Sequence, residues 1–150
     1  VSMATLSIDI GGLERKAEEE ARRIRALIEL ARQESILENR EQALEIEPQR
    51  YRFLALAQDG WYPLEGDGTF RERRPADGLE LDLEALDGSL AVGEEEGADR
   101  GRIYLLSSGE VTPFELAIGA RDSERVFYRL ESDPLGRMNI EKVEQVEPQW

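Results

Sequence analysis

Apolar residues between positions 10 and 37 recur every three or four residues, which is the spacing of one face of an α-helix. The positions that share this face are Ile10, Leu13, Ala17, Ala21, Ile24, Ile28, Ala31 and Ser35. Leu27 widens the face, and most of the remaining positions carry Glu, Arg or Lys. The pattern predicts an amphipathic helix over about 10–37, with Asp9 as its N-cap, Gly11 and Gly12 loosening its entry, and Asn39 as its stop.

After Asn39 the pattern changes to short apolar runs of period two, separated by Gly, Asp and Pro turns that are typical of β-strands. The runs are 44–46, 51–56, 61–64, 70–74, 79–84, 90–92, 103–106, 111–118, 126–130 and 138–143. Pro113 within one run indicates a sheet edge or the start of a strand. The Gly-rich, acidic stretch 93–101 predicts a mobile surface loop.

The order of these elements predicts the fold class. One helix followed by roughly eight short strands over about 42–143 favours an α+β domain over alternating βαβ units. We therefore expect a single globular domain over 1–150, in which the N-terminal amphipathic helix packs on antiparallel β-sheets.

Charge and composition exclude several functions. The formal net charge is −14, whereas nucleic-acid binding depends on clustered Lys and Arg that neutralise phosphates. An anionic membrane surface would repel such a chain, and solubility alone would explain its acidity. The sequence contains no His and no Cys. It therefore cannot form a Ser-His-Asp triad, a Cys-His dyad or the usual zinc sites, and no catalytic residue is predicted.

The carboxylates do not form a recognisable site. No pair has a spacing that selects it for glycoside hydrolysis, which needs two carboxylates across a sugar. Asp59, Glu65 and Asp67, and the acidic residues of 94–99, lack the spaced pattern of a calcium-binding loop. The glycine-rich phosphate cradle is also absent. We expect neither a metal nor a cofactor.

Aromatic side chains near the first hairpin allow two interpretations. Tyr51, Trp61, Tyr62 and Phe70 could stack on a sugar or a base, or they could fill a small β core. Their alternation along strands favours the core.

The polar side of the helix also allows two interpretations. In the first, the helix covers its own sheet and its charges are merely solvated. In the second, residues off the apolar face bind partner helices and set their register. The candidates for this interface are Arg15, Lys16, Glu18, Glu19, Arg22, Arg23, Ala26 and Leu30. Within it we expect the i,i+4 pairs Glu18–Arg22 and Glu19–Arg23.

Several motifs occur in an order that is similar to one known family. They are Leu30-Ala31-Arg32-Gln33-Glu34-Ser35-Ile36 at the helix end, Tyr51-Arg52-Phe53, Trp61-Tyr62-Pro63-Leu64, the Arg-rich stretch 71–79, Leu105-Leu106-Ser107-Ser108-Gly109-Glu110-Val111-Thr112-Pro113-Phe114, and Asp133-Pro134-Leu135-Gly136-Arg137. Together they resemble the H-type minor pseudopilins, the GspH family of bacterial type II secretion, and the related FimT-type pilins.

This resemblance implies a pilin-like fold and a structural, non-enzymatic role. The subunit would join the pseudopilus near its tip, with the J-, I- and K-type minor pseudopilins above the G-type major subunit, and would support export of folded proteins. Family members begin with a leader and a hydrophobic helix. The chain is therefore expected to be a soluble, monomeric domain on the periplasmic side of a protein inserted in the inner membrane.

Two alternatives stay open beside this resemblance. One is a carbohydrate- or ligand-binding β module, and the other is a FimT-like type IV minor pilin. An exposed aromatic platform would favour the ligand-binding module, whereas buried Trp61 and Tyr51 would favour the scaffold.

Overall fold

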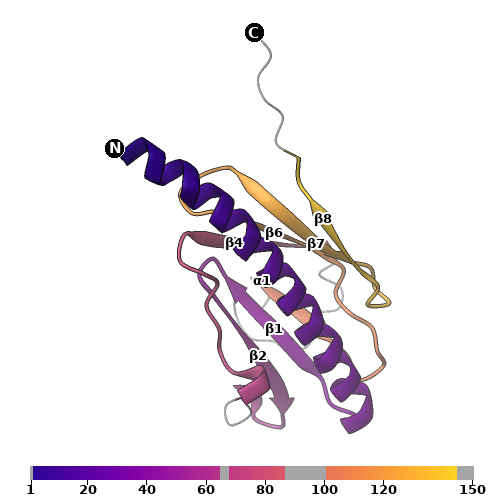
Figure 1. Cartoon of the computed structure of the whole chain (residues 1–150). Helices are drawn as coiled ribbons and strands as arrows, with labels where there is room; N and C mark the ends of the chain where they lie inside the picture. The colour runs from indigo at the N-terminus through magenta and orange to yellow at the C-terminus, as the bar shows by residue number, and fades with distance from the viewer. Residues whose placement is uncertain (1, 65–67, 87–100, 145–150) are drawn as a thin grey trace.

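One long helix lies across two antiparallel sheets in the computed structural model, which describes residues 2–64, 68–86 and 101–144 (Figure 1). The elements in chain order are α1 (Ser2–Glu38), β1 (Gln42–Glu47), β2 (Arg50–Ala57), β3 (Gly60–Pro63), the 3-10 helix η1 (Gly68–Phe70), β4 (Leu79–Ala85), β5 (Arg102–Leu105), β6 (Phe114–Ala120), β7 (Val126–Ser132) and β8 (Met138–Lys142). One sheet has the order β3-β2-β1-β5 and the other β4-β6-β7-β8. The predicted α+β class, with the N-terminal helix packed on antiparallel sheets of eight short strands among the described residues, is confirmed.

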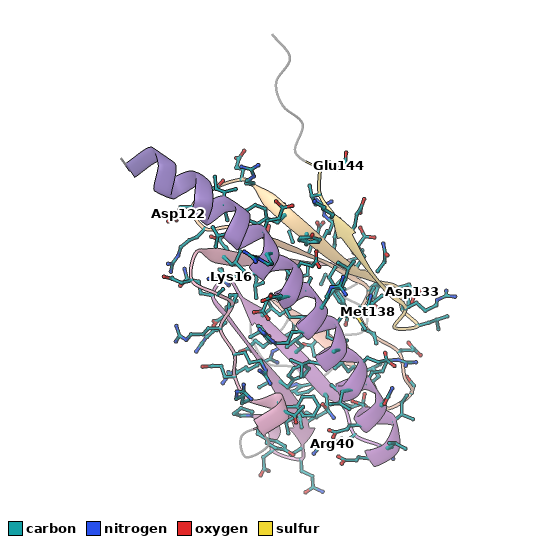
Figure 2. All side chains as sticks on the ribbon, in the orientation of Figure 1. Lys16, Arg40, Asp122, Asp133, Met138 and Glu144 are labelled. Atoms are coloured by element: carbon teal, nitrogen blue, oxygen red, sulfur yellow. The ribbon has the colours of Figure 1, made fainter. Side chains whose placement is uncertain are left out.

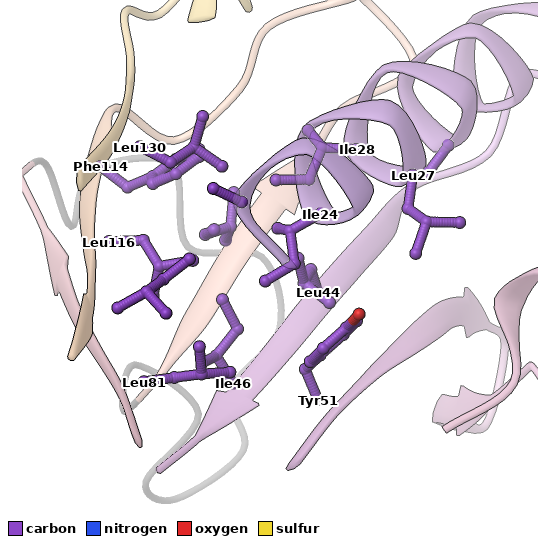
Figure 3. Packing of buried hydrophobic residues seen from close by; sticks show 14 of the residues in the cluster. Ile24, Leu27, Ile28, Leu44, Ile46, Tyr51, Leu81, Phe114, Leu116 and Leu130 are labelled. Carbon is purple, nitrogen blue, oxygen red and sulfur yellow. The ribbon is translucent and has the colours of Figure 1, made fainter. Parts of the chain in front are cut away.

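The core lies where α1 meets both sheets. The predicted apolar face of the helix is buried at Ala17, Ala21, Ile24, Ile28 and Ala31, each 0% exposed. Figure 3 shows Ile24 and Ile28 pointing from α1 into a cluster of side chains that come from both sheets. The labelled members from the strands are Leu44, Ile46, Tyr51, Leu81, Phe114, Leu116 and Leu130. Burial of this apolar area is the main force that holds the helix to the sheets.

The start of the helix differs from the prediction. The helix begins at Ser2, so Asp9 lies within it and is not its N-cap. Gly11 and Gly12 do not end the helix, because glycine costs about 1 kcal/mol relative to alanine but keeps its backbone hydrogen bond. Ile10 was predicted on the buried face but is 40% exposed. The reason is geometric, since the N-terminal end of α1 extends past both sheets (Figure 1).

The end of the helix agrees with the prediction. Asn39 follows the last helical residue with a φ of 51°, in the left-handed region. The Arg40 N–H donates to the Ser35 carbonyl at 3.1 Å, and the Asn39 N–H donates to the Ile36 carbonyl at 3.4 Å. This is the paired hydrogen bonding of a Schellman motif, and it satisfies two carbonyls that the helix end would otherwise leave free.

Most predicted strands are present with shifted ends. The predicted run 70–74 is not a strand: η1 occupies its start, and a single bridge joins Tyr51 to Arg73 before Pro75, which cannot donate to a ladder. β6 begins directly after Pro113, as predicted for a strand start. The predicted run 90–92, and the loop 93–101 apart from its last residue, lie outside the described residues.

Candidate protein interface on the N-terminal helix

A buried carboxylate on α1 fixes the helix to the first sheet. Glu20 is 2% exposed, and its Oε2 accepts a hydrogen bond of 2.7 Å from the hydroxyl of Tyr51 on β2. Nη1 of Arg23 donates to the other carboxylate oxygen at 3.0 Å. Burial and the Glu20 hydrogen bond raise the pKa of Tyr51 above its ordinary value. Each carboxylate oxygen of Glu20 thus has a hydrogen-bond partner, and a buried charge needs such partners to offset its lost hydration.

A second carboxylate fixes the helix to the other sheet. Glu18 accepts a hydrogen bond of 2.6 Å from the hydroxyl of Tyr128 on β7, and Nη2 of Arg22 lies 3.4 Å from its other oxygen. The Tyr128 hydrogen bond is the main cause that lowers the pKa of Glu18, and the same bond raises the pKa of Tyr128 to about 12. Because Glu18 and Glu20 are two residues apart, they point to opposite flanks of the helix.

The C-terminal half of α1 is held by Arg32. Its Nε donates to the Gly109 carbonyl at 2.9 Å, and its Nη1 lies 3.5 Å from Glu29 Oε1. The same guanidinium covers Gly136, where an added Cβ would lie 2.7 Å from Nε. Gly109 and Gly136 both have positive φ values, of 94° and 80°. Arg32 therefore contacts the two turns that carry the late motifs of the sequence.

The side of α1 that points away from the sheets remains exposed. We call it the outward face and define it by Arg15, Glu19, Arg22, Ala26, Leu30 and Leu37, which share one side of the helix. Its N-terminal half is charged, and its C-terminal half carries exposed leucines beside Gln33, which donates to Glu29 at 3.2 Å. Leu30 is 41% exposed and Leu37 is 83% exposed. Such a combination of charge and exposed leucine is typical of a helix that binds another protein.

The structure divides the predicted interface residues into three groups. Arg15, Glu19, Arg22, Ala26 and Leu30 lie on the outward face, and Glu18 turns to the second sheet. Lys16, which is labelled on α1 in Figure 2, and Arg23 lie on the flank toward the segment 71–78. Lys16 and Arg15 line a hollow there with Asp77, Gly78 and Arg121. 

Of the two expected ion pairs, Glu18–Arg22 is confirmed and Glu19–Arg23 is wrong. Arg23 pairs with Glu20 instead, because the buried carboxylate has the greater need of a countercharge. Sequence reasoning missed Glu20. Its place between Ala17 and Ile24, on the apolar face, was the available signal.

The four aromatic candidates have different environments. Tyr51 and Phe70 are 1% and 2% exposed, and Phe70 packs edge-on against Phe53 with ring centroids 5.0 Å apart. Trp61 is half-buried against Tyr104 on the opposite side of the first sheet. The core interpretation is therefore confirmed for Tyr51 and Phe70, and it is wrong for Tyr62, which is 41% exposed at the end of a short strand.

Two further features bear on the candidate site. Among residues 2–64, 68–86 and 101–144, no three His, Cys, Asp or Glu side chains are grouped so that they could hold a metal ion. In the same part of the chain, no helix has the length and apolar character needed to cross a membrane. The outward face of α1 is thus the strongest candidate site.

A long N-terminal helix that packs on two antiparallel sheets and leaves its other side exposed is the arrangement of a pilin-like protein. The sequence model of the family described as type II transport protein GspH matches residues 20–136. The chain belongs to this GspH family of type II secretion pseudopilins, which are structural and non-enzymatic proteins. The family resemblance seen in the sequence is therefore confirmed.

Individual relatives agree with this assignment. The chain is 34% identical over 138 residues to type II secretion system protein H of Pseudomonas aeruginosa, covering 89% of this chain and 80% of the relative. It is similar to the crystal structure of the minor pseudopilin EPSH from the type II secretion system of Vibrio cholerae, with a TM-score of 0.70 and 26% identity over 89% of this chain and 99% of the other. The type IV minor pilin FimU of Pseudomonas aeruginosa has a TM-score of 0.54 at 14% identity, covering 83% of this chain and 91% of the pilin. That likeness is one of fold alone.

Proposed function

We propose that this protein is a minor subunit near the tip of the type II secretion pseudopilus, where it assembles through the outward face of α1. Its neighbours are the J-, I- and K-type minor pseudopilins and the G-type major pseudopilin, and the assembly supports export of folded proteins. The observation that carries the proposal is the division of α1 into two sides. Glu18, Glu20 and Arg32 bind one side to the sheets, while the other side stays exposed.

The chemistry of the outward face supports a protein neighbour. Leu30 and Leu37 supply apolar area whose burial favours association. Arg15, Glu19 and Arg22 supply charges of both signs, which favour one register of a neighbouring helix over others. The leucines thus contribute affinity for a neighbour, and the charged residues contribute specificity.

The same proposal includes a membrane anchor. A hydrophobic helix that precedes α1 holds the protein in the inner membrane, and the domain described here lies on the periplasmic side as a monomer until it assembles. The N-terminal end of α1 extends past both sheets, which leaves room for a continuous longer helix (Figure 1). Fractionation of cells that produce the complete protein tests this point, since an anchored protein sediments with membranes after a high-salt wash.

The outward face is tested by replacing Leu30 and Leu37 together with Glu. We expect the variant to fold, because both side chains are exposed, and to lose co-purification with the other pseudopilins and secretion of folded substrates. Leu86→Glu is the control, since Leu86 is 56% exposed, directly follows β4 and is not part of α1. Normal assembly of the double variant would contradict the proposal.

The charged half of the face needs a separate variant. Charge reversal at Arg22 alone is preferable to reversal at both Arg22 and Arg23. Arg23 compensates the buried carboxylate of Glu20, so its reversal would destabilise the domain as well. We expect Arg22→Glu to weaken assembly while leaving the fold intact.

A further inference from the structure

One flank of α1 concentrates positive charge in a chain whose net charge is −14. We define this basic flank by Lys16, Arg23, Arg71, Arg73, Arg74 and Arg121. Four of these arginines line an open hollow of about 500 Å³ beside the helix. Arg74 and Arg121 line the adjoining hollow, and Arg121 shares the next one with Lys16. The fold thus brings cations from α1, from the segment 71–78 and from the end of β6 onto one continuous surface.

Local contacts hold Arg71 and Arg73 without neutralising them, whereas the charge of Arg23 is already paired with Glu20. Nη1 of Arg71 donates to the Gly68 carbonyl at 2.6 Å, and Nη2 of Arg73 donates to the Thr69 carbonyl at 3.1 Å. Both acceptors are uncharged backbone groups, so each guanidinium is positioned but keeps its positive field. A pre-positioned guanidinium loses less side-chain entropy when it binds a carboxylate.

The carboxylates that share the lining are too few to balance the cations. Among the described residues that line these hollows, they are Glu72 and Asp77. Asp77 lies 3.7 Å from Nη1 of Arg121, but its side chain is fully solvated, and an exposed pair at that distance contributes little. Glu72 is already 3.5 Å from Arg50, which lies outside the flank. Among the described residues, the basic flank therefore carries an excess of positive charge toward solvent.

We propose that the basic flank docks the carboxylate-rich surface of a neighbouring pseudopilin, an inference that rests on the function proposed above. The flank adjoins the outward face of α1, so a subunit that binds the helix also reaches these arginines. Planar guanidinium groups bind carboxylates through paired hydrogen bonds, which favours an acidic protein surface. An anionic bilayer fits less well, because it would repel the rest of a strongly acidic domain.

The test compares two double variants that each remove two positive charges. Arg71→Gln with Arg74→Gln changes the basic flank, and Arg137→Gln with Lys142→Gln changes exposed cations on β8 and the turn before it. The purified J-, I-, K- and G-type globular domains are titrated with the wild-type domain and both variants at several salt concentrations. We expect one of these domains to bind, with an affinity that falls as salt rises. The flank variant should weaken binding by about tenfold and flatten the salt dependence, whereas the control stays within about twofold.

Three outcomes would overturn the docking proposal. The first is equal binding by both variants, and the second is absence of binding by the wild type to every pseudopilin domain. The third is loss, in the flank variant alone, of self-association or of binding to phosphatidylglycerol–phosphatidylethanolamine vesicles while pseudopilin binding is unchanged. That result would assign the flank to a second copy or to a membrane.

The failure of this inference differs from failure of the proposed function. A complete protein that never enters the pseudopilus in cells contradicts the function itself. A protein that enters the pseudopilus, and whose flank variant binds as well as the wild type, contradicts the docking role alone.

Discussion

The hydroxyl of Tyr51 donates a hydrogen bond of 2.7 Å to the carboxylate of Glu20, which lies 31 residues earlier in the chain. The bond joins the middle of α1 to β2 inside the core, where both groups are almost completely buried. Water cannot replace either partner at that depth, so the pair fixes the rotation of the helix on the first sheet.

Removal of the Tyr51 hydroxyl should therefore destabilise the domain. We expect Tyr51→Phe to lower the free energy of unfolding by about 1–3 kcal/mol, because Glu20 keeps only Arg23 as a partner. Urea denaturation measures the change. Tyr62→Phe is the matched control and should stay within about 0.5 kcal/mol, since Tyr62 is exposed. Equal effects of the two substitutions would mean that the buried bond contributes nothing specific.

Because Glu18 and Tyr128 share a hydrogen bond, we expect the folding stability of the domain to fall at both acidic and alkaline pH. The pKa of Glu18 is lower in the folded protein than its ordinary value of 4.5, so its contribution is present above that pH and is lost as the pH falls through the folded value. The pKa of Tyr128 is raised from 10.0 to about 12, so its contribution is present below pH 10 and is lost as the pH rises through about 12.

The measurement is the melting temperature of the wild type and of Tyr128→Phe across this pH range. The difference between the two proteins should be largest between pH 5 and pH 9 and should shrink on both sides, in the windows set by the shifted pKa values. A constant difference at every pH would show that the hydrogen bond does not depend on the ionisation of either group.

Two isoleucines of the same helix should respond differently to truncation. Ile24 is fully buried in the core, and Ile24→Ala should cost about 2–5 kcal/mol from lost burial and the cavity left behind. Ile10→Ala should cost about 0.5 kcal/mol or less, because that side chain lies beyond the sheets and is already exposed. Chemical denaturation of both variants checks the comparison. A large effect at Ile10 would mean that the sheets support the helix further toward its N-terminus.

Gly136 should be sensitive to a single added methyl group. Gly136→Ala places a Cβ 2.7 Å from Arg32 Nε and also forces alanine to a φ of 80°. We expect a loss of about 1–3 kcal/mol, part from the backbone and part from displacement of Arg32. In an Arg32→Ala background the second part should disappear, so the two substitutions should not be additive.

The control for this cycle is Gly68→Ala, since an added Cβ there meets nothing within 4 Å and Gly68 has no positive φ. It should be close to neutral. Strict additivity of Gly136→Ala and Arg32→Ala would show that the two residues do not interact.

The sequence predicted those features that depend on local periodicity. The apolar spacing through Ala17, Ile24 and Ile28 identified the helix and its buried face, and Asn39 identified its end. The helix start was missed because glycines weaken a helix without ending it. The length of helix that the sheets cover depends on the whole fold. The exposure of Ile10 therefore could not be predicted from its helical spacing.

The candidate site was predicted only in part, because its members are separated in sequence. Helical spacing identified the outward face at Arg22, Ala26 and Leu30, but it could not show that Glu18 turns to a tyrosine 110 residues later. Arg32 belonged to a recognised motif, yet its carbonyl partner lies 77 residues away and is chosen by tertiary packing. The basic flank likewise needs the fold to bring Lys16 and Arg121 beside the arginines of 71–74.

Attachment of α1 at both Glu18 and Glu20 has a mechanical consequence. The two bonds lie within one helical turn and pull on different sheets, and Arg32 adds a third attachment nearer the C-terminal end. A force applied along the helix axis is therefore divided between both sheets, and neither sheet can slide or pivot without breaking an attachment. We therefore expect the domain to respond to such a force as a single stiff body, a property that would suit the filament subunit proposed above.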